Sequence, residues 1–127
     1  MILSSIYIAG TGSMGRGVFT SAAIEKDTVI EVSPVLVMSN EERKLLDKTL
    51  LHDYIFEWGI QKEKCCMALG YVPVYNHSFR SNCEYIMDYT DNNIIIKTVR
   101  DIAAGEELFI NYNGEWNDEA PLWFEAR

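Results

Sequence analysis

The sequence predicts a mainly β fold in a single domain, and three observations support this prediction. Most of its apolar runs are short and end at Gly, Asn, Asp or Lys, which is the pattern of β-strands. A single segment has the start signal of a helix. The chain has 127 residues, 48% of them hydrophobic, so it can bury one core but is too short for two.

Strands are expected where β-branched and aromatic residues gather between turn residues. The triplet Ile94–Ile96 follows Asp91–Asn93, and because Asn and Asp tolerate the positive φ of a tight turn, this order predicts a hairpin. Pro34, Pro73 and Pro121 are expected at strand boundaries or in loops. The expected strands are Ile2–Ala9, Gly17–Ser21, Thr28–Val32, Val35–Met38, Tyr85–Tyr89, Ile94–Val99 and Leu108–Tyr112.

A helical insertion is expected over about residues 39–64. Ser39 and Glu42 have the spacing of a capping box, and leucines recur after them at helical spacing, which predicts a helix from Glu41 to about His52. Beyond it, alternate residues would give an extended segment one aromatic and aliphatic face, which core packing explains best. That face consists of Tyr54, Phe56, Trp58 and Ile60.

The charge favours a basic partner. Asp and Glu number 19 and Lys and Arg 11, for a net charge of −8. Affinity for nucleic acid comes from clustered Lys and Arg, so we expect no direct nucleic-acid binding. Residues 101–127 carry seven acidic residues and one basic residue, a net charge of −6, and this stretch is either a solvated face or a surface that attracts cations.

The cysteines and the N-terminus indicate the compartment. Three cysteines, two of them adjacent at Cys65 and Cys66, match neither a disulfide framework nor a zinc-binding spacing, so no metal is expected. The N-terminus lacks the pattern of a signal peptide, and no apolar run approaches the ~18 residues of a membrane span. We therefore expect a soluble cytoplasmic protein without a membrane partner, with nuclear or nucleoid association left open.

Four stretches differ from an ordinary β protein. Gly15-Arg16-Gly17 precedes a strand, and alternate glycines let a ligand approach the backbone closely. Asn76-His77-Ser78 places three hydrogen-bonding side chains between strand signals, and Gly105–Tyr112 runs from a turn into a strand that ends on tyrosine. The tail, about 113–127, is aromatic, and exposed aromatics are costly unless they pack or line a site. Its aromatic residues are Trp116, Trp123 and Phe124.

In this order, the stretches resemble the SET-domain protein lysine methyltransferases over nearly the whole chain. The resemblance implies one SET domain over residues 1–127, made of small β-sheets whose C-terminal segment threads beside the Asn-His-Ser strand in a knot-like arrangement. It also implies that S-adenosylmethionine and a substrate lysine bind on opposite faces, joined by a narrow channel. Phe79 stands where members with a zinc-binding segment have cysteine, so the chain resembles short bacterial and viral members, which can form homodimers.

The resemblance also assigns residues to roles. Tyr112 matches the catalytic tyrosine of the family. The implied cofactor-binding residues are Met14, Gly15, Arg16, Gly17, Asn76 and His77. The expected walls of the substrate-lysine channel are Tyr54, Tyr71, Trp116, Trp123 and Phe124.

Some assignments stay open at this point. Arg16 either pairs with the cofactor carboxylate or is a solvated turn residue, and Ile110, where some relatives tune the number of methyl groups, leaves the degree of methylation undecided. Glu106 and Glu107 are expected to be turn and surface residues, one of them bonded to the backbone, and not an acid–base pair. Cys83 is expected to be a small buried hydrophobe.

Two functions are the main candidates for these residues, and a third, a small β-barrel interaction domain without a cofactor, is disfavoured by the glycine-flanked Arg16. The leading one is an S-adenosylmethionine-dependent protein-lysine N-methyltransferase acting on a basic protein or tail, such as a histone, a histone-like protein or a ribosomal protein. The alternative is a catalytically silent SET domain that binds a lysine-rich tail or a partner. The presence of Tyr112 together with Asn76 and His77 favours the enzyme, because a silent domain has no chemical need for all three.

Overall fold

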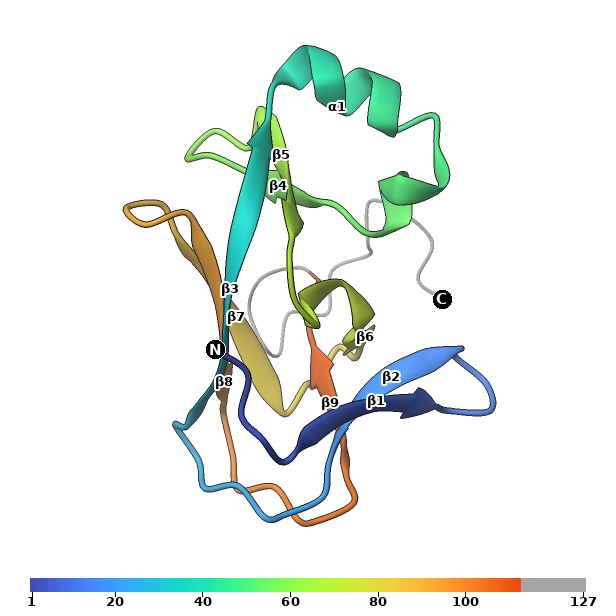
Figure 1. The fold of residues 1–127 in the computed structure, drawn as a ribbon, viewed down its shortest axis with the longest axis vertical. Helices are drawn as coiled ribbons and strands as arrows, with labels where there is room; N and C mark the ends of the chain where they lie inside the picture. Colours follow the sequence, from blue (N-terminus) through green and yellow to red (C-terminus); the bar gives the residue numbers. More distant parts are fainter. Residues whose placement is uncertain (113–127) are drawn as a thin grey trace.

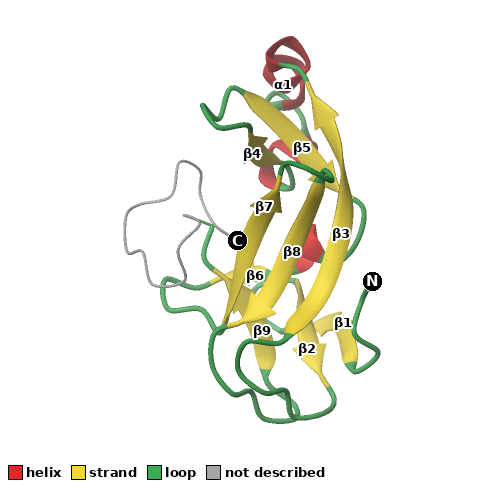
Figure 2. Ribbon diagram, turned by 90° about the vertical axis from the view of Figure 1, so that its left-hand side faces the viewer, coloured by secondary structure: helices red, strands yellow, loops and turns green. Residues whose placement is uncertain are grey.

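The computed structural model describes residues 1–112, which fold into two β-sheets with a short α-helix at one end (Figure 1). The larger sheet has five strands in the order β4-β5-β3-β8-β7, and the smaller has four in the order β1-β2-β9-β6. Figure 2 shows the larger sheet as a twisted layer with the smaller sheet at its lower end. The strands are β1 (Ile6–Gly10), β2 (Arg16–Thr20), β3 (Val29–Met38), β4 (Phe56–Trp58), β5 (Lys64–Ala68), β6 (Asn76–His77), β7 (Cys83–Asp88), β8 (Asn93–Thr98) and β9 (Glu107–Ile110). This confirms the predicted mainly β class.

β3 is one long strand that changes partners along its length. Its first part pairs with β8 as far as Pro34, and its second part, from Val35 to Met38, pairs with β5. The expectation of two strands separated at Pro34 is therefore wrong. The proline is tolerated inside the strand because its missing N–H falls where one ladder ends and the next begins.

The predicted hairpin is confirmed, although its bounds differ slightly. β7 and β8 pair antiparallel from Cys83 opposite Thr98 to Asp88 opposite Asn93. Asn92 has φ 55° in the turn between them, which is the left-handed conformation that Asn adopts more readily than most residues. β1, in contrast, starts at Ile6 and not at Ile2, since Ile2 forms only an isolated bridge with Glu31.

The helical insertion begins as predicted and ends earlier. Ser39 caps α1 (Asn40–Leu46) in a full capping box with Glu42, which confirms the start signal. The expected continuation to His52 is wrong. The Thr49 hydroxyl donates to the Leu46 carbonyl (2.7 Å) and accepts from the amide of Leu51 (3.2 Å), so it closes one helix and caps a separate 3-10 turn, η1 (Leu50–Asp53).

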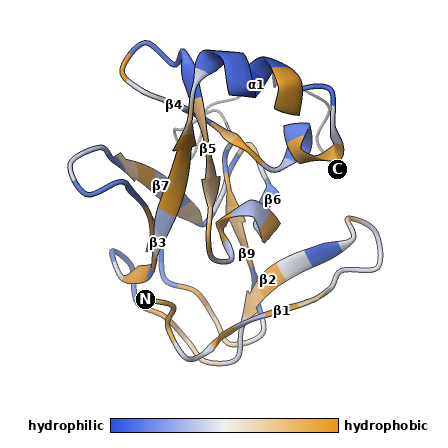
Figure 3. Ribbon diagram, turned by 45° about the horizontal axis from the view of Figure 1, so that its top comes forward, coloured by the Kyte–Doolittle hydropathy of each residue, from blue (hydrophilic) through white to orange (hydrophobic). Residues whose placement is uncertain are grey.

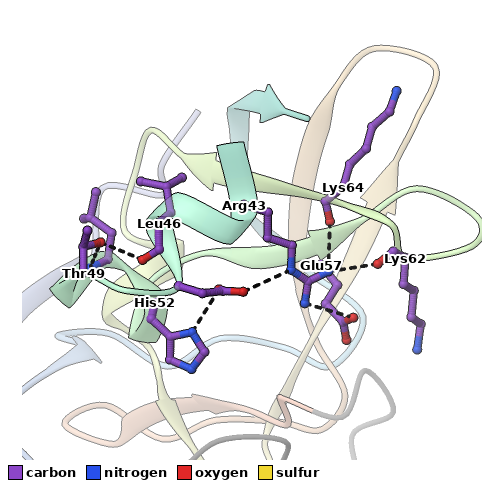
Figure 4. A network of polar contacts seen from close by, with 9 residues as sticks. Arg43, Leu46, Thr49, His52, Glu57, Lys62 and Lys64 are labelled. Carbon is purple, nitrogen blue, oxygen red and sulfur yellow. Dashed lines mark hydrogen bonds and ion pairs between the residues drawn. The ribbon is translucent and has the colours of Figure 1, made fainter. Parts of the chain in front are cut away.

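Arg43 ties the insertion to the β4–β5 hairpin (Figure 4). Its guanidinium donates to the carbonyl of Lys62 (2.9 Å) and forms an ion pair with Glu57 (3.3 Å). Asp47 lies 3.9 Å from the same guanidinium and 3.0 Å from the His52 ring. The extended segment after η1 becomes β4, in which Trp58 is buried and Phe56 half-buried, whereas Ile60 lies in the following turn, 91% exposed, and so leaves the predicted apolar face.

The hydrophobic core joins the two sheets. Ile30, Ile94 and Ile96 of the larger sheet pack in one cluster with Leu108 and Ile110 of the smaller sheet. Figure 3 shows the contrast between the largely hydrophobic β3, β5 and β7 and the largely hydrophilic α1. β5 was not among the expected strands, although its two cysteines are fully buried.

β9, the last strand in residues 1–112, lies between β2 and β6 and is therefore beside the Asn-His pair. It runs antiparallel to β2 and parallel to β6, with Asn76 opposite Phe109 and His77 opposite Ile110. This confirms that the C-terminal strand lies beside the Asn-His-Ser strand, and the knot-like threading stays a prediction. The Asn82 side chain holds β9 in this position. Its amide donates to the Glu107 carbonyl (2.8 Å), and its oxygen accepts from the Phe109 amide (2.7 Å).

Burial accounts for the cysteines. All three are buried free thiols, and burial raises the pKa of Cys83 to about 12, as befits the small hydrophobe expected there. Across residues 1–112, no three His, Cys, Asp or Glu side chains come together as a metal site requires. No helix in that part of the chain is long and apolar enough to cross a membrane.

We predict that Asn82→Ala lowers the free energy of unfolding by about 2–4 kcal/mol, because two backbone groups of β9 lose their partners inside the protein. Urea unfolding followed by tryptophan fluorescence measures this change. Asn40→Ala, at an exposed position in α1, is the matched control and should change the value by no more than about 0.5 kcal/mol. Equal effects of the two substitutions would contradict the role given to Asn82.

Candidate active site

Hydrogen bonds within the loop between β1 and β2 fix its conformation. The Thr11 hydroxyl accepts from the amide of Met14 (2.7 Å) and donates to the carbonyl of Gly15 (2.9 Å). Gly15 has φ 70°, a conformation that costs glycine little and strains other residues. Gly15 and Arg16 are exposed and Met14 is half-buried, so this loop presents backbone to its surroundings beside the buried Gly17.

Gly17 permits a close approach of three elements. A Cβ at this position would collide with the carboxylate of Glu107 and come within 2.9 Å of Asn76 Nδ2. The buried Asn76 amide donates to the Arg16 carbonyl (3.1 Å) and to Glu107 Oε2 (2.9 Å), which leaves its oxygen as the group that can accept a hydrogen bond. β2, β6 and β9 therefore meet at one polar junction.

The two adjacent glutamates behave differently from each other. Glu106 confirms the expected turn role, because its carboxylate accepts from the Ala103 amide (2.5 Å) and Arg100 lies 3.2 Å away; the backbone bond is the main reason that its pKa is lowered. Glu107 is half-buried against Gly17 and Asn76, so it is more than a surface residue. Sequence spacing alone does not reveal this contact, because it depends on the pairing of β9 with β2.

One ring nitrogen of His77 accepts a hydrogen bond from the backbone of Tyr112, and the other has no partner among residues 1–112. Nδ1 accepts from the Tyr112 amide (3.1 Å), so the proton of the neutral ring resides on Nε2. Nε2 is buried, and within the part of the chain that the structure describes it has no hydrogen-bond partner. Burial lowers the pKa of His77, which favours the neutral ring.

Tyr112 is held at both ends. Its hydroxyl donates to the Tyr75 carbonyl (2.6 Å), and its own carbonyl accepts from the Tyr85 hydroxyl (3.1 Å). The ring of Phe56 meets it edge-on with centroids 6.4 Å apart, and the His77 ring lies at 5.1 Å. Because the hydroxyl proton is engaged by a carbonyl, the oxygen can act on an incoming amine only as an acceptor.

Sequence reasoning missed two aromatic residues of this site. Phe56 and Tyr85 contact each other edge-to-face, with centroids 5.4 Å apart, and both contact Tyr112. Phe56 belongs to the alternating aromatic stripe that was attributed to the core, and Tyr85 to an expected strand. The aromatic stripe after the helix was the available signal, but it did not distinguish Phe56 from its neighbour Tyr54.

The predicted channel residues have different outcomes. Tyr71 is half-buried and, like Phe56, Tyr85 and Tyr112, packs against the core cluster. Tyr54 is half-buried at the end of η1. Trp116, Trp123 and Phe124 lie outside the described residues. Their channel roles, like those of Tyr54 and Tyr71, stay predictions.

Comparison with known proteins identifies the relatives of this chain. The sequence profile of the SET domain matches residues 15–113. A Schizosaccharomyces pombe protein named histone-lysine N-methyltransferase, H3 lysine-37 specific, is 36% identical over 126 residues, which cover 98% of this chain and 80% of that protein.

Solved structures agree with the sequence match. A Plasmodium falciparum crystal structure assigned as a histone methyltransferase is 33% identical with a TM-score of 0.67, and the alignment covers 91% of this chain and 98% of that one. A Chaetomium thermophilum Polycomb Repressive Complex 2 structure has a TM-score of 0.72 at 20% identity, covering 87% of this chain and 15% of that one, and shows likeness of fold alone.

We predict that acid weakens the fold through His77. Its pKa in the folded protein is lowered from 6.5, so below that pH the unfolded state binds the proton more readily and the free energy of unfolding falls as the pH falls. Asn at this position can accept the same hydrogen bond but does not titrate. Urea unfolding between about pH 7 and pH 5 should therefore show a steeper loss of stability in the wild type than in His77→Asn. Parallel pH profiles would contradict this account.

Proposed function

The chain belongs to the SET-domain family of protein-lysine methyltransferases, and we propose that it transfers a methyl group from S-adenosylmethionine to a lysine side chain of a histone or another basic protein. The observation that carries the proposal is the position of the Tyr112 hydroxyl. It is fixed by the Tyr75 carbonyl at 2.6 Å, within an aromatic group formed with Phe56 and Tyr85.

The residues of the site suit methyl transfer to an amine. Attack requires the amine lone pair to point along the breaking bond, and such alignment is worth about 7–11 kcal/mol in well-oriented systems. Tyr112 would orient the amine by accepting a hydrogen bond from one of its N–H groups. This agrees with the Tyr112 hydroxyl, whose own proton is donated to the Tyr75 carbonyl. Lysine must lose a proton before attack, and burial among aromatic side chains favours the neutral amine.

The polar junction of β2, β6 and β9 is the proposed cofactor site. When bound, S-adenosylmethionine supplies a methyl group on positively charged sulfur. The residues proposed to hold it are Met14, Gly15, Arg16 and Gly17 with Asn76 and His77. Three features support this: the exposed backbone at Gly15, the close approach that Gly17 permits, and the buried Nε2 of His77 that lacks a partner among the described residues.

The substrate class rests on charge and on relatives. The net charge of −8, with −6 units within residues 101–127, favours a basic protein. The S. pombe relative is named for lysine 37 of histone H3, so a histone tail is the first substrate to test. Cytoplasmic location and homodimer formation rest on the sequence alone, and sedimentation velocity would test the dimer.

We predict that Tyr112→Phe lowers methyl transfer about 100-fold or more, because the amine loses the group that orients it. Transfer of a labelled methyl group to core histones and to fractionated basic proteins measures the activity. The affinity for S-adenosylmethionine, measured by calorimetry, should stay within about twofold. Tyr89→Phe, at a tyrosine that is 45% exposed, should retain wild-type activity. Undiminished turnover in Tyr112→Phe would refute the assignment.

We also predict that salt weakens substrate capture. The excess of acidic residues in the stretch 101–127 would attract a basic peptide, and salt screens this attraction. The KM for a basic peptide should rise roughly threefold or more between about 50 and 300 mM NaCl, with kcat little changed. Sucrose at equal osmolality is the control. A KM that does not respond to salt would contradict this prediction and would favour the other interpretation of the acidic stretch, a solvated face.

A further inference from the structure

Glu31 is a fully buried carboxylate that the reaction described above does not use. It lies on β3 with an exposed fraction of 0%. Its Oε1 accepts from the Tyr75 hydroxyl (2.9 Å), and its Oε2 accepts from the Tyr71 amide (2.7 Å), with the Val72 amide as a further donor. A buried carboxylate is costly unless such donors surround it, so this arrangement is specific.

The Glu31 carboxylate accepts hydrogen bonds from both ends of one short segment, residues 71–75. At the start of the segment it accepts from the backbone of Tyr71 and Val72, where the 3-10 turn η2 (Val72–Val74) begins without a capping bond from its own N-cap side chain. At the end it accepts from the side chain of Tyr75. Gly70 allows the approach, because a Cβ there would collide with the Glu31 carboxylate.

The segment leads directly to the reacting group. The carbonyl of Tyr75 is the acceptor of the Tyr112 hydroxyl proton, at 2.6 Å. Asn76, the next residue, opens β6 and enters the proposed cofactor junction. A shift of Tyr75 would therefore move the acceptor that orients the Tyr112 hydroxyl.

We infer that Glu31 is a positioning residue for methyl transfer: by clamping residues 71–75 from β3, it fixes the Tyr75 carbonyl and, through it, the direction of the Tyr112 hydroxyl. This inference rests on the proposed function of Tyr112. Glu31 acts on the Tyr112 hydroxyl only indirectly, through the segment 71–75 that it holds. The clamp joins the larger sheet, which carries Glu31, to the smaller sheet, which carries β6.

The ionisation of the two partners agrees with this role. Desolvation raises the pKa of Glu31, while the hydrogen bonds from Tyr75 and the backbone lower it. Burial, followed by the nearby Glu31 charge, raises the pKa of Tyr75 well above its ordinary value. Tyr75 therefore keeps its proton and remains a donor to the carboxylate.

Two substitutions loosen the clamp at different points. Tyr75→Phe removes the hydroxyl while it keeps the ring and the backbone bonds of Glu31, and Glu31→Gln keeps the shape but removes the charge. Each should lower kcat about 10- to 100-fold, because small misplacements of aligned groups cost that much, and should leave the KM for S-adenosylmethionine nearly unchanged. If Glu31→Gln does not fold, Tyr75→Phe carries the test.

Combination with Tyr112→Phe distinguishes positioning from general stabilisation. Without the Tyr112 hydroxyl there is nothing left to orient, so under single-turnover conditions neither substitution should lower the remaining rate further. Thr98→Val is the matched control: it removes a buried hydroxyl with partners at Glu25 (2.8 Å) and Thr28 (2.9 Å), and should reduce stability without lowering kcat.

Equal rate losses in the wild-type and Tyr112→Phe backgrounds would overturn the inference alone. A wild-type protein that transfers no methyl group to any histone or basic protein fraction would refute the proposed function, and the inference with it. An unchanged kcat in Tyr75→Phe would likewise overturn the role of Glu31.

Discussion

The parallel pairing of β6 with β9 is the contact on which the rest of the structure depends. These strands lie more than 25 residues apart in sequence, and their pairing sets Asn76 opposite Phe109 and His77 opposite Ile110. Two residues beyond β9, Tyr112 consequently reaches both the His77 ring and the Tyr75 carbonyl. β6 is a strand of only two residues. The pairing of β9 with β2 and the side chain of Asn82, bonded to both Glu107 and Phe109, add to its hold on β9.

Buried polar groups give the site its precision. In a medium of low dielectric constant a hydrogen bond is strong and an unpaired polar atom is costly, so Glu31, Asn76 and Asn82 each permit few alternative arrangements. Their bonds cross between sheets or strands, unlike the local bonds of turns. The hydrophobic core stabilises the fold without selecting one orientation of a hydroxyl, whereas this set of bonds specifies where the Tyr112 oxygen lies.

Local signals in the sequence predicted local structure well. The capping box at Ser39 and the turn at Asn92 act through neighbouring residues, and both were found as expected. The order of the three motifs also indicated the family. Features that depend on distant partners were missed: Pro34 is tolerated because β3 exchanges β8 for β5, and Phe56 reaches Tyr112 only once β4 is docked. The sequence around Glu31 carries no signal of its role, since its three donors come from about 40 residues later in the chain.

The most direct test of the central claim, that β6 and β9 together build a methyl-transfer site around Tyr112, is a crystal structure with S-adenosylhomocysteine and a lysine-containing histone peptide. The account predicts the sulfur beside the Gly15–Gly17 loop and Asn76, and the lysine amine within hydrogen-bond distance of the Tyr112 hydroxyl, which still donates to the Tyr75 carbonyl. A lysine bound away from Tyr112, or a Tyr112 hydroxyl turned away from Tyr75 in the complex, would contradict it.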